Sequence, residues 1–185
     1  MKNFFRKILS MPLKFFLRVF FEDRFLKGKY FDNCFVGYRW ALRSIWLRNI
    51  LRIEKPLPWP ASSTCIVSES KNIIFHPDDL HIFQVPGIYF QNFKAIIVIG
   101  RGCYIAPNVG LITANHNIID LDLHTEGKGI TLGDKCWIGM NSVILPGVIL
   151  GERTIVAANS VVTKSFEQGN VILAGSPARV IKVIN

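Results

Sequence analysis

The chain has 185 residues, of which 22 are Lys or Arg and 13 are Asp or Glu, so its formal net charge is +9. Half of the residues are hydrophobic and 12% are aromatic. This composition excludes a disordered or collagen-like chain, and the length is sufficient for one domain with a full core and no disulfide staples.

The positive charge is concentrated at the N-terminal end. Residues 1–55 contain 13 Lys or Arg and 4 Asp or Glu, whereas residues 56–185 contain nine of each. The same first 55 residues contain 13 of the aromatic side chains. A basic, aromatic segment therefore precedes a neutral body, and the two require separate explanations.

Two amphipathic helices are predicted within residues 1–55. In residues 13–27, Lys14, Arg18 and Glu22 recur every four residues and form one polar stripe, while phenylalanines cover most of the remaining helical surface. In residues 37–53, Trp, Leu and Ile side chains are interleaved with arginines, which predicts a second helix.

These helices have two interpretations that stay open. They could pack on the main body or on a partner subunit, with the arginines toward water. Alternatively they lie in the plane of an anionic membrane, with Phe and Trp buried and Lys and Arg at the headgroups, and the density of Phe beside Lys and Arg favours this contact. We expect no nucleic-acid binding, because no base-reading motif accompanies the charge.

No targeting or membrane-spanning segment is expected. Charged residues interrupt every apolar stretch near the N-terminus, and none approaches the roughly 18 apolar residues of a spanning helix. The four cysteines form no Cys-x-x-Cys pair. We therefore predict a cytoplasmic protein with reduced thiols, peripheral on the inner face of the cell membrane.

Alternating prolines follow the basic segment. Pro56, Pro58 and Pro60 enforce an extended backbone and exclude a helix. We assign residues 56–72 to a linker that leads into the body, and residues 73–185 to the body itself.

The body contains a six-residue repeat. Aliphatic residues recur at this spacing without interruption: Leu132, Ile138, Ile144, Leu150, Val156 and Val162. Ile99, Ile105 and Leu111 form a second run. Small or β-branched residues follow four positions after each of these aliphatics except Leu111 and Val162. A period of six fits neither a helix nor a simple strand alternation. It fits a three-sided prism, with one short strand per face and corners closed by Gly, Asn or Asp.

One histidine is placed to do chemistry on this prism. His116 takes the sixth position of its hexapeptide, which points outward because positions one and five face the interior. The period breaks directly afterward, since 21 residues separate Leu111 from Leu132. Loops on rigid scaffolds commonly carry function, so the polar loop 117–130 predicts an active site here. Histidine is largely neutral at cellular pH and can accept a proton as a general base.

Several linked segments resemble one family. The chain is similar to the hexapeptide-repeat acyltransferases, most of all to the group of maltose, galactoside, xenobiotic and nodulation-factor acetyltransferases and polysaccharide O-acetyltransferases. The resemblance covers residues 89–183 and rests on these segments: Tyr89–Phe93, Ile105–Val109, Thr113–His116, Cys136–Gly139, Ile144–Val148 and Ala174–Ile181. It implies a mainly β fold, a left-handed parallel β-helix, behind the helical segment 1–55. It also implies acetyl-CoA as co-substrate and a homotrimer with the donor groove between subunits.

The resemblance also implies roles for single residues. His116 would be the general base, Asn92 would contact the acceptor, and Trp137 would lie beside the active site. Asn115 and Asn117 flank the histidine and would orient it or the acceptor. Asn92 as a corner residue and Trp137 as a subunit contact remain alternatives.

The acetyl-CoA site is expected along the later coils. Small residues there allow close approach of the thioester arm, and cations would face the nucleotide phosphates, although each could equally be a solvated charge. The candidates are Gly139, Ala157, Ala158, Gly175, Lys164, Arg179 and Lys182.

We therefore predict an O-acetyltransferase that moves acetyl from acetyl-CoA to a sugar hydroxyl in bacterial capsule, lipopolysaccharide or exopolysaccharide biosynthesis, on an acceptor that could be lipid-linked. One alternative is an enzyme that acetylates a soluble compound such as an antibiotic. Another is a β-helix without transferase activity that binds a partner or, like some carbonic anhydrases, zinc. Zinc would need three of His76, His81, His116 and His124, but His124 lies off the repeat, and we expect no metal.

Overall fold

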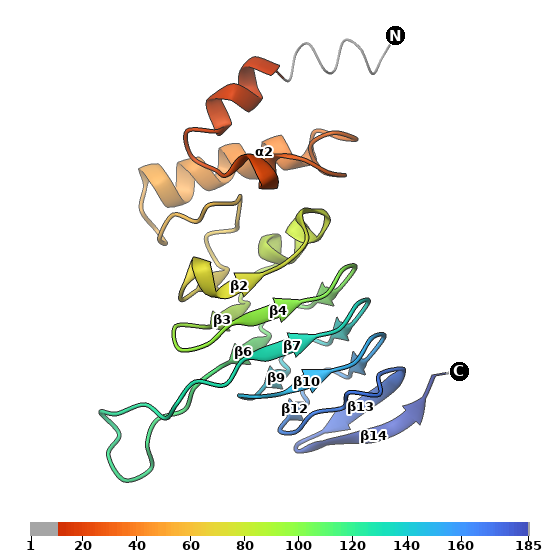
Figure 1. Cartoon of the computed structure of the whole chain (residues 1–185). Coiled ribbons are helices and arrows are strands. Elements are labelled where there is room, and N and C mark those ends of the chain that lie inside the picture. Colours follow the sequence, from red (N-terminus) through yellow and green to blue (C-terminus); the bar gives the residue numbers. More distant parts are fainter. Residues whose placement is uncertain (1–10, 185) are drawn as a thin grey trace. The chain divides into compact units, whose positions relative to one another are not determined.

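The computed structural model describes residues 11–184. Its backbone separates into two compact units, one up to Ser63 and one from Thr64 onward. Figure 1 shows helices in the first unit and stacked strands in the second.

The N-terminal unit is helical over residues 11–17 and then contains three short elements. They are the 3₁₀ turn η1 (Asp23–Leu26), the α-helix α2 (Val36–Ser44) and the π-helical segment η2 (Ile45–Ile50), which continues α2. Its buried apolar side chains include Leu17, Phe21, Phe25, Leu26, Phe31, Tyr38, Ile45, Leu57 and Trp59. The basic segment therefore has a hydrophobic core of its own.

The proline-rich stretch contributes to this core. The Trp59 ring packs against Phe25 with centroids 5.3 Å apart. The guanidinium of Arg48, which is fully buried, donates from Nε to the Lys55 carbonyl at 2.8 Å and from Nη1 to the Ser62 carbonyl at 2.5 Å. Arg48 thereby fastens the stretch to η2, so residues 56–60 are part of the first unit.

The first predicted helix is shorter than expected. Residues 13–27 do not form one helix, because the helical backbone ends at residue 17 and resumes only as η1. Phenylalanines on nearly all sides of a straight helix could not all be buried. The turn between residue 17 and η1 brings Phe21 and Phe25 into the core. Within it, the Glu22 amide donates to the Pro58 carbonyl at 2.9 Å. The second predicted helix, 37–53, is present as α2 and η2 and ends three residues earlier.

The second unit is a three-sided coil of short strands (Figure 1). The strands are β1 (Ile66–Val67), β2 (Ile73–Ile74), β3 (Tyr89–Gln91), β4 (Ile97–Ile99), β5 (Tyr104–Ile105), β6 (Gly110–Ile112), β7 (Ile130–Leu132), β8 (Trp137–Ile138), β9 (Val143–Ile144), β10 (Ile149–Leu150), β11 (Ile155–Val156), β12 (Val161–Val162), β13 (Val171–Gly175) and β14 (Ala178–Val183). Two further 3₁₀ segments, η3 (Ser70–Asn72) and η4 (Pro77–Gln84), belong to the first coils.

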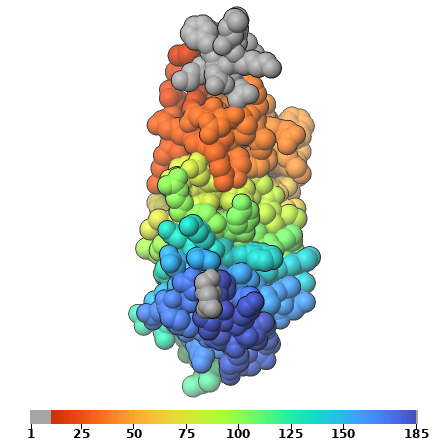
Figure 2. All heavy atoms as spheres, turned by 90° about the vertical axis from the view of Figure 1, so that its right-hand side faces the viewer, coloured from red at the N-terminus to blue at the C-terminus, as the bar shows by residue number. Residues whose placement is uncertain are grey.

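Three sheets form the faces of the prism, with orders β1-β3-β6-β9-β12, β2-β4-β7-β10 and β5-β8-β11-β13-β14. All pairs are parallel except β13 and β14, which form an antiparallel hairpin at the end of the coil. Successive coils stack in chain order, visible on one face of this unit as colours running from green to blue (Figure 2).

The repeat places its residues as predicted. All six aliphatics from Leu132 to Val162 are buried in the prism, as are the small residues Cys136, Ser142, Val148, Thr154 and Ser160. Ile105 and Ile138 are in register across β5 and β8, and Ile138 and Val156 across β8 and β11, so interior side chains form columns along the axis.

Buried thiols occupy two of the small positions. Cys103 and Cys136 lie in neighbouring coils and are both fully buried. A hydrogen bond with Cys136 and burial raise the pKa of the Cys103 thiol. All four cysteines are free thiols, and Cys34 is the only one with partial exposure.

The longest stretch without a strand in the described coil lies between β6 and β7. Residues 113–129 leave the prism as a long extension (Figure 1). This is the position where the sequence loses its six-residue period, and it carries the predicted histidine.

Candidate active site

The extension is a β-hairpin that faces two histidines toward each other. The Thr125 amide donates to the Asn115 carbonyl and the Asn117 amide to the Leu123 carbonyl, both at 2.8 Å. This ladder places His116 opposite His124. Their rings stack with centroids 4.3 Å apart and an interplanar angle of 35°.

The backbone of the hairpin sets the tautomer of His116. Its Nδ1 lies 2.6 Å from the Leu121 carbonyl oxygen. A carbonyl can only accept, so Nδ1 carries the proton and Nε2 keeps its lone pair. The His116 side chain is exposed to solvent.

An aromatic side chain from the prism completes the stack. Phe93, which follows β3, meets the His124 ring edge-on with centroids 5.1 Å apart and an angle of 83°. The order Phe93, His124, His116 therefore ties the hairpin to a corner of the coil. The sequence analysis missed Phe93 and His124 as site residues, although Phe93 belongs to a segment that carries the resemblance.

Two neighbours of Phe93 hold this corner in place. Gln91 accepts from the amides of Thr113 and Ala114 at 3.0 and 3.1 Å and donates to the Ala114 carbonyl at 3.0 Å, which fixes the start of the hairpin. Asn92 is fully buried. Its amide accepts from the Glu69 amide at 2.9 Å and donates to the carbonyls of Glu69 and Asn72 at 2.7 and 3.0 Å. These contacts favour the corner role for Asn92, whose next residue reaches His124.

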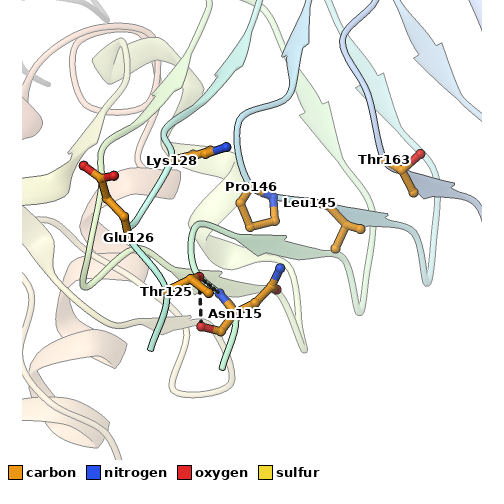
Figure 3. Close-up of a pocket in the computed structure, with 7 residues that line it drawn as sticks. All are labelled: Asn115, Thr125, Glu126, Lys128, Leu145, Pro146 and Thr163. Atoms are coloured by element: carbon orange, nitrogen blue, oxygen red, sulfur yellow. Dashed lines mark hydrogen bonds between the residues drawn. The ribbon is translucent and has the colours of Figure 1, made fainter. Parts of the chain in front are cut away.

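A cleft of about 410 Å³ lies at the base of the hairpin (Figure 3). It is lined by Asn115, Thr125, Glu126, Lys128, Leu145, Pro146 and Thr163. Side chains alternate between the two faces of an extended strand, so the Asn115 side of the hairpin, with this cleft, is opposite the His116 side.

A signal in the repeat marks part of this cleft. The position after each interior aliphatic is Gly or Ala on most faces, but it is Leu145 after β9 and Thr163 after β12. These larger outward side chains lie on the sheet that contains β9 and β12, and they form part of the wall of the cleft. Glu126 and Lys128 lie within the polar loop 117–130 that was predicted to form the active site.

The other predicted residues are spread over the second unit. Asn117 shapes the hairpin tip, where its Oδ1 accepts from the Ile119 amide at 2.8 Å. Trp137 is exposed on β8, in register with Tyr104 and Ile155, on a different sheet from β6. The structure therefore brings Asn115, His116 and Asn117 together and leaves Trp137 and Asn92 elsewhere within one chain.

Most of the residues expected to bind acetyl-CoA lie along the sheet β5-β8-β11-β13-β14, but Lys164 follows β12 and belongs to another sheet. A Cβ on Gly139 would come within 2.6 Å of the Ala158 amide nitrogen and 2.9 Å of the Ala157 carbonyl carbon, so these three residues stack in consecutive coils. Gly175, with φ of 103°, ends β13, and its amide donates to Ser160 Oγ at 3.2 Å. The three cations, Lys164, Arg179 and Lys182, have exposed side chains.

The histidines do not assemble into a metal site. His81 packs against Tyr104 with centroids 4.9 Å apart, whereas His116 packs against His124. Within residues 11–184, no group of three or more His, Cys, Asp or Glu side chains is arranged to hold a metal ion. No helix in this described part combines the length and apolarity needed to cross a membrane.

Comparison with known proteins places the repeat in a family. Residues 129–164 match the family model described as "Bacterial transferase hexapeptide (six repeats)". Together with the three parallel sheets, this match confirms the predicted fold class, a left-handed parallel β-helix of hexapeptide repeats behind a helical segment.

Individual relatives match half of the chain or somewhat more. The galactoside O-acetyltransferase of Escherichia coli is 39% identical over 107 residues, which cover 52% of each chain. The putative lipopolysaccharide biosynthesis O-acetyl transferase WbbJ of the same species is 31% identical over 62% of this chain and 63% of its own. A hexapeptide-repeat acetyltransferase of Vibrio cholerae, solved with acetyl-CoA, is 36% identical over 49% of this chain and 51% of its own, with a TM-score of 0.47.

The chain spans about half the length of the curated relatives that it matches first. Residues 129–164 thus match the repeat of the bacterial transferase hexapeptide family, and about half of the chain is similar to proteins named as acetyltransferases.

Proposed function

We propose that this protein is an acetyl-CoA-dependent O-acetyltransferase that acts on a sugar hydroxyl. The observation that carries the proposal is the contact between His116 Nδ1 and the Leu121 carbonyl, which leaves Nε2 as an exposed base on a rigid coil. The names of the matched relatives support acetyl transfer as the reaction class.

The chemistry requires one base. The acceptor hydroxyl attacks the thioester carbonyl, its proton passes to Nε2 of His116, and the C–S bond breaks. The imidazolium then returns the proton to the departing CoA sulfur, so the histidine ends neutral. Proton transfer of this kind contributes roughly 10²–10⁴-fold in rate.

The acceptor is proposed to be a glycan intermediate of bacterial capsule, lipopolysaccharide or exopolysaccharide biosynthesis. The likeness to a putative lipopolysaccharide O-acetyl transferase supports this choice over a soluble antibiotic. A basic, aromatic N-terminal unit supports it as well, because precursors of such glycans are carried on membrane lipids, and residues 1–55 would place the enzyme at an anionic membrane surface.

The donor is proposed to lie along the coil beside Gly139, Ala157, Ala158 and Gly175, with Lys164, Arg179 and Lys182 near its phosphates. Trp137, exposed on the same sheet, would line this groove. Within one chain the sheet of Trp137 is not the sheet that carries the His116 hairpin. This separation supports a homotrimer in which base and donor groove come from different subunits, with three times the 21.0 kDa chain mass in solution.

The decisive experiment is an acyl-transfer assay. The full chain is mixed with acetyl-CoA and a panel of sugars, lipid-linked glycans and antibiotics, and the release of free thiol is followed. We expect turnover with a glycan acceptor, its loss in His116→Ala, and its retention in the control His76→Ala. The transferase proposal fails if no acceptor gives turnover above the His116→Ala background.

A further inference from the structure

The N-terminal unit exposes apolar side chains on two helical segments with different electrostatic surroundings. On the first segment, residues 11–27, the cations are neutralised locally. Lys14 pairs with Asp32 at 3.2 Å, Arg18 with Asp23 at 2.8 Å, Arg24 with Glu22 at 2.6 Å, and Lys27 also pairs with Asp23. The arginine and lysine next to Asp23 hold the pKa of its carboxyl below the usual value.

The second segment, α2 with η2, has no such neutralisation. No Asp or Glu occurs between Asp32 and Glu54. Arg39 and Arg43 are exposed and make no ion pair with any carboxylate among the described residues. Every carboxylate of the first segment already faces a cation of its own, so this helix keeps its positive charge.

The same side of α2 and η2 is apolar. Leu42, Trp46 and Ile50 are 46%, 56% and 58% exposed and recur every four residues, so they form one stripe along the helix. The opposite side is buried in the unit, through Tyr38, Ala41, Ile45 and Arg48. We call the exposed side, made of Arg39, Leu42, Arg43, Trp46 and Ile50, the outer face.

We infer that the outer face of α2 and η2 lies flat on an anionic lipid surface, and that it, rather than the phenylalanine-rich first segment, is the membrane contact of this protein. The inference rests on the proposed membrane location and names the surface responsible. Trp46 and Ile50 would enter the boundary between headgroups and acyl chains, and Arg39 and Arg43 would meet the lipid phosphates. Each such cation adds electrostatic attraction to an anionic leaflet.

The positive charge of the outer face favours an anionic lipid surface over a second copy of the chain as its binding partner. A two-fold contact would bring the same face of both chains together, with the arginines of one copy near those of the other and no carboxylate on the face to neutralise them. An anionic lipid surface neutralises the arginines and accepts the Leu, Trp and Ile side chains at once. Trp at such a depth is also the residue best suited to the interface.

The test is flotation of the full chain with vesicles of phosphatidylcholine alone or with about 30% phosphatidylglycerol, a fraction chosen to give a strongly negative surface. The outer-face variant is Trp46→Ser with Ile50→Ser. The matched control is Phe15→Ser with Val19→Ser, which removes two apolar side chains that are 74% and 76% exposed on the first segment. A third variant, Arg39→Glu with Arg43→Glu, tests the charge.

We expect binding only to anionic vesicles, at least a tenfold weaker partition for both outer-face variants, and less than a threefold change for the control. Trp46 emission should also shift to shorter wavelength on binding. The inference is overturned if the control loses binding while the outer-face variants keep it, or if the wild-type chain does not float. If the outer-face variants have a lower oligomer mass than the wild-type chain but float equally well, the outer face contacts a second copy of the chain. That result also overturns the inference.

Acetyl transfer to a soluble acceptor is measured on the same samples. Intact turnover without vesicle binding rejects the membrane contact and leaves the transferase proposal standing. Vesicle binding that depends on the outer face, in a protein without turnover, supports the membrane contact and rejects the transferase proposal.

Discussion

At the scale of single residues, the site depends on how a solvent-exposed imidazole is held still. One carbonyl, that of Leu121, fixes the tautomer of His116, and one ring, that of His124, covers its face. Exposed side chains otherwise sample several rotamers, so these two contacts would position His116 for its proposed role as the base.

The stack with His124 leads to a kinetic prediction. In His124→Ala the His116 ring loses a contact worth roughly 0.5–1.5 kcal/mol, so kcat should fall by up to about tenfold with little change in KM for either substrate. His124→Phe keeps an aromatic ring in place and should recover most of the activity. Steady-state kinetics decide the matter, and a loss that is equally large in both variants would mean that the imidazole itself takes part.

Asn92 gives a prediction about stability. Its buried amide satisfies the backbone of Glu69 and Asn72, so Asn92→Ala leaves polar groups unpaired and should lower the free energy of unfolding by about 1–3 kcal/mol. KM for the acceptor should stay close to wild type. Urea denaturation and kinetics measure the two effects, and unchanged stability with a raised acceptor KM would instead make Asn92 an acceptor ligand.

At the scale of elements, the corners of the prism are built from residues that tolerate left-handed backbone. Asn108, Asn141 and Asn159 have φ of 59°, 59° and 58° at equivalent corners of successive coils. Their amides form a ladder, from Asn108 to Asn141 and from Asn141 to Asn159, with both bonds at 3.2 Å. Each corner therefore suits its own backbone and supports the next coil.

The middle rung of this ladder can be tested. Asn141→Ala removes both side-chain bonds and places a Cβ residue in the left-handed region, so the free energy of unfolding should fall by about 1–2 kcal/mol or somewhat more. Asn141→Gly loses the bonds but not the backbone conformation, and should cost less. If thermal or urea unfolding shows equal losses for Ala and Gly, the ladder bonds rather than the backbone conformation dominate.

At the scale of the whole molecule, charge and chemistry are divided between the two parts of the chain. Residues 1–55 carry all of the net charge, and the body is balanced at nine against nine. The proposed base, acceptor and donor residues all belong to the second unit, while the proposed membrane contact belongs to the first. One part would determine the location of the enzyme and the other its reaction.

This division predicts different responses to salt. Raising sodium chloride from about 0.05 M to about 0.5 M screens the arginines and should release the protein from anionic vesicles. At saturating acetyl-CoA, kcat for a soluble acceptor should change less than twofold over the same range, because the body has no net charge to screen. Parallel flotation and turnover assays check this, and vesicle binding that survives high salt would point to a purely apolar contact.

The prism and its interior could be derived from the sequence. Every sixth residue from Leu132 to Val162 is aliphatic, and only one backbone geometry buries such a period, so the fold and its core were determined locally. The interruption after Leu111 marked the hairpin, and the outward histidine on it is the proposed base. The left-handed sense of the coil came from the resemblance to a family, because composition does not contain it.

Features that depend on contacts between residues far apart in the chain could be seen only in the tertiary structure. The sequence pattern predicted one helix over residues 13–27 and a linker over residues 56–72. Neither pattern shows that Phe25 packs on Trp59, or that Arg48 binds the carbonyls of Lys55 and Ser62 on either side of the prolines. For Asn92 the sequence left two roles open, an acceptor contact and a corner residue, and its burial and bonds to Glu69 and Asn72 favour the corner role. The contact of Phe93 with His124 appears only in the folded chain. A six-residue period reports which side chain faces inward, but contacts between coils and across the hairpin join residues far apart in the chain, and only the folded chain brings Phe93, His124 and His116 together.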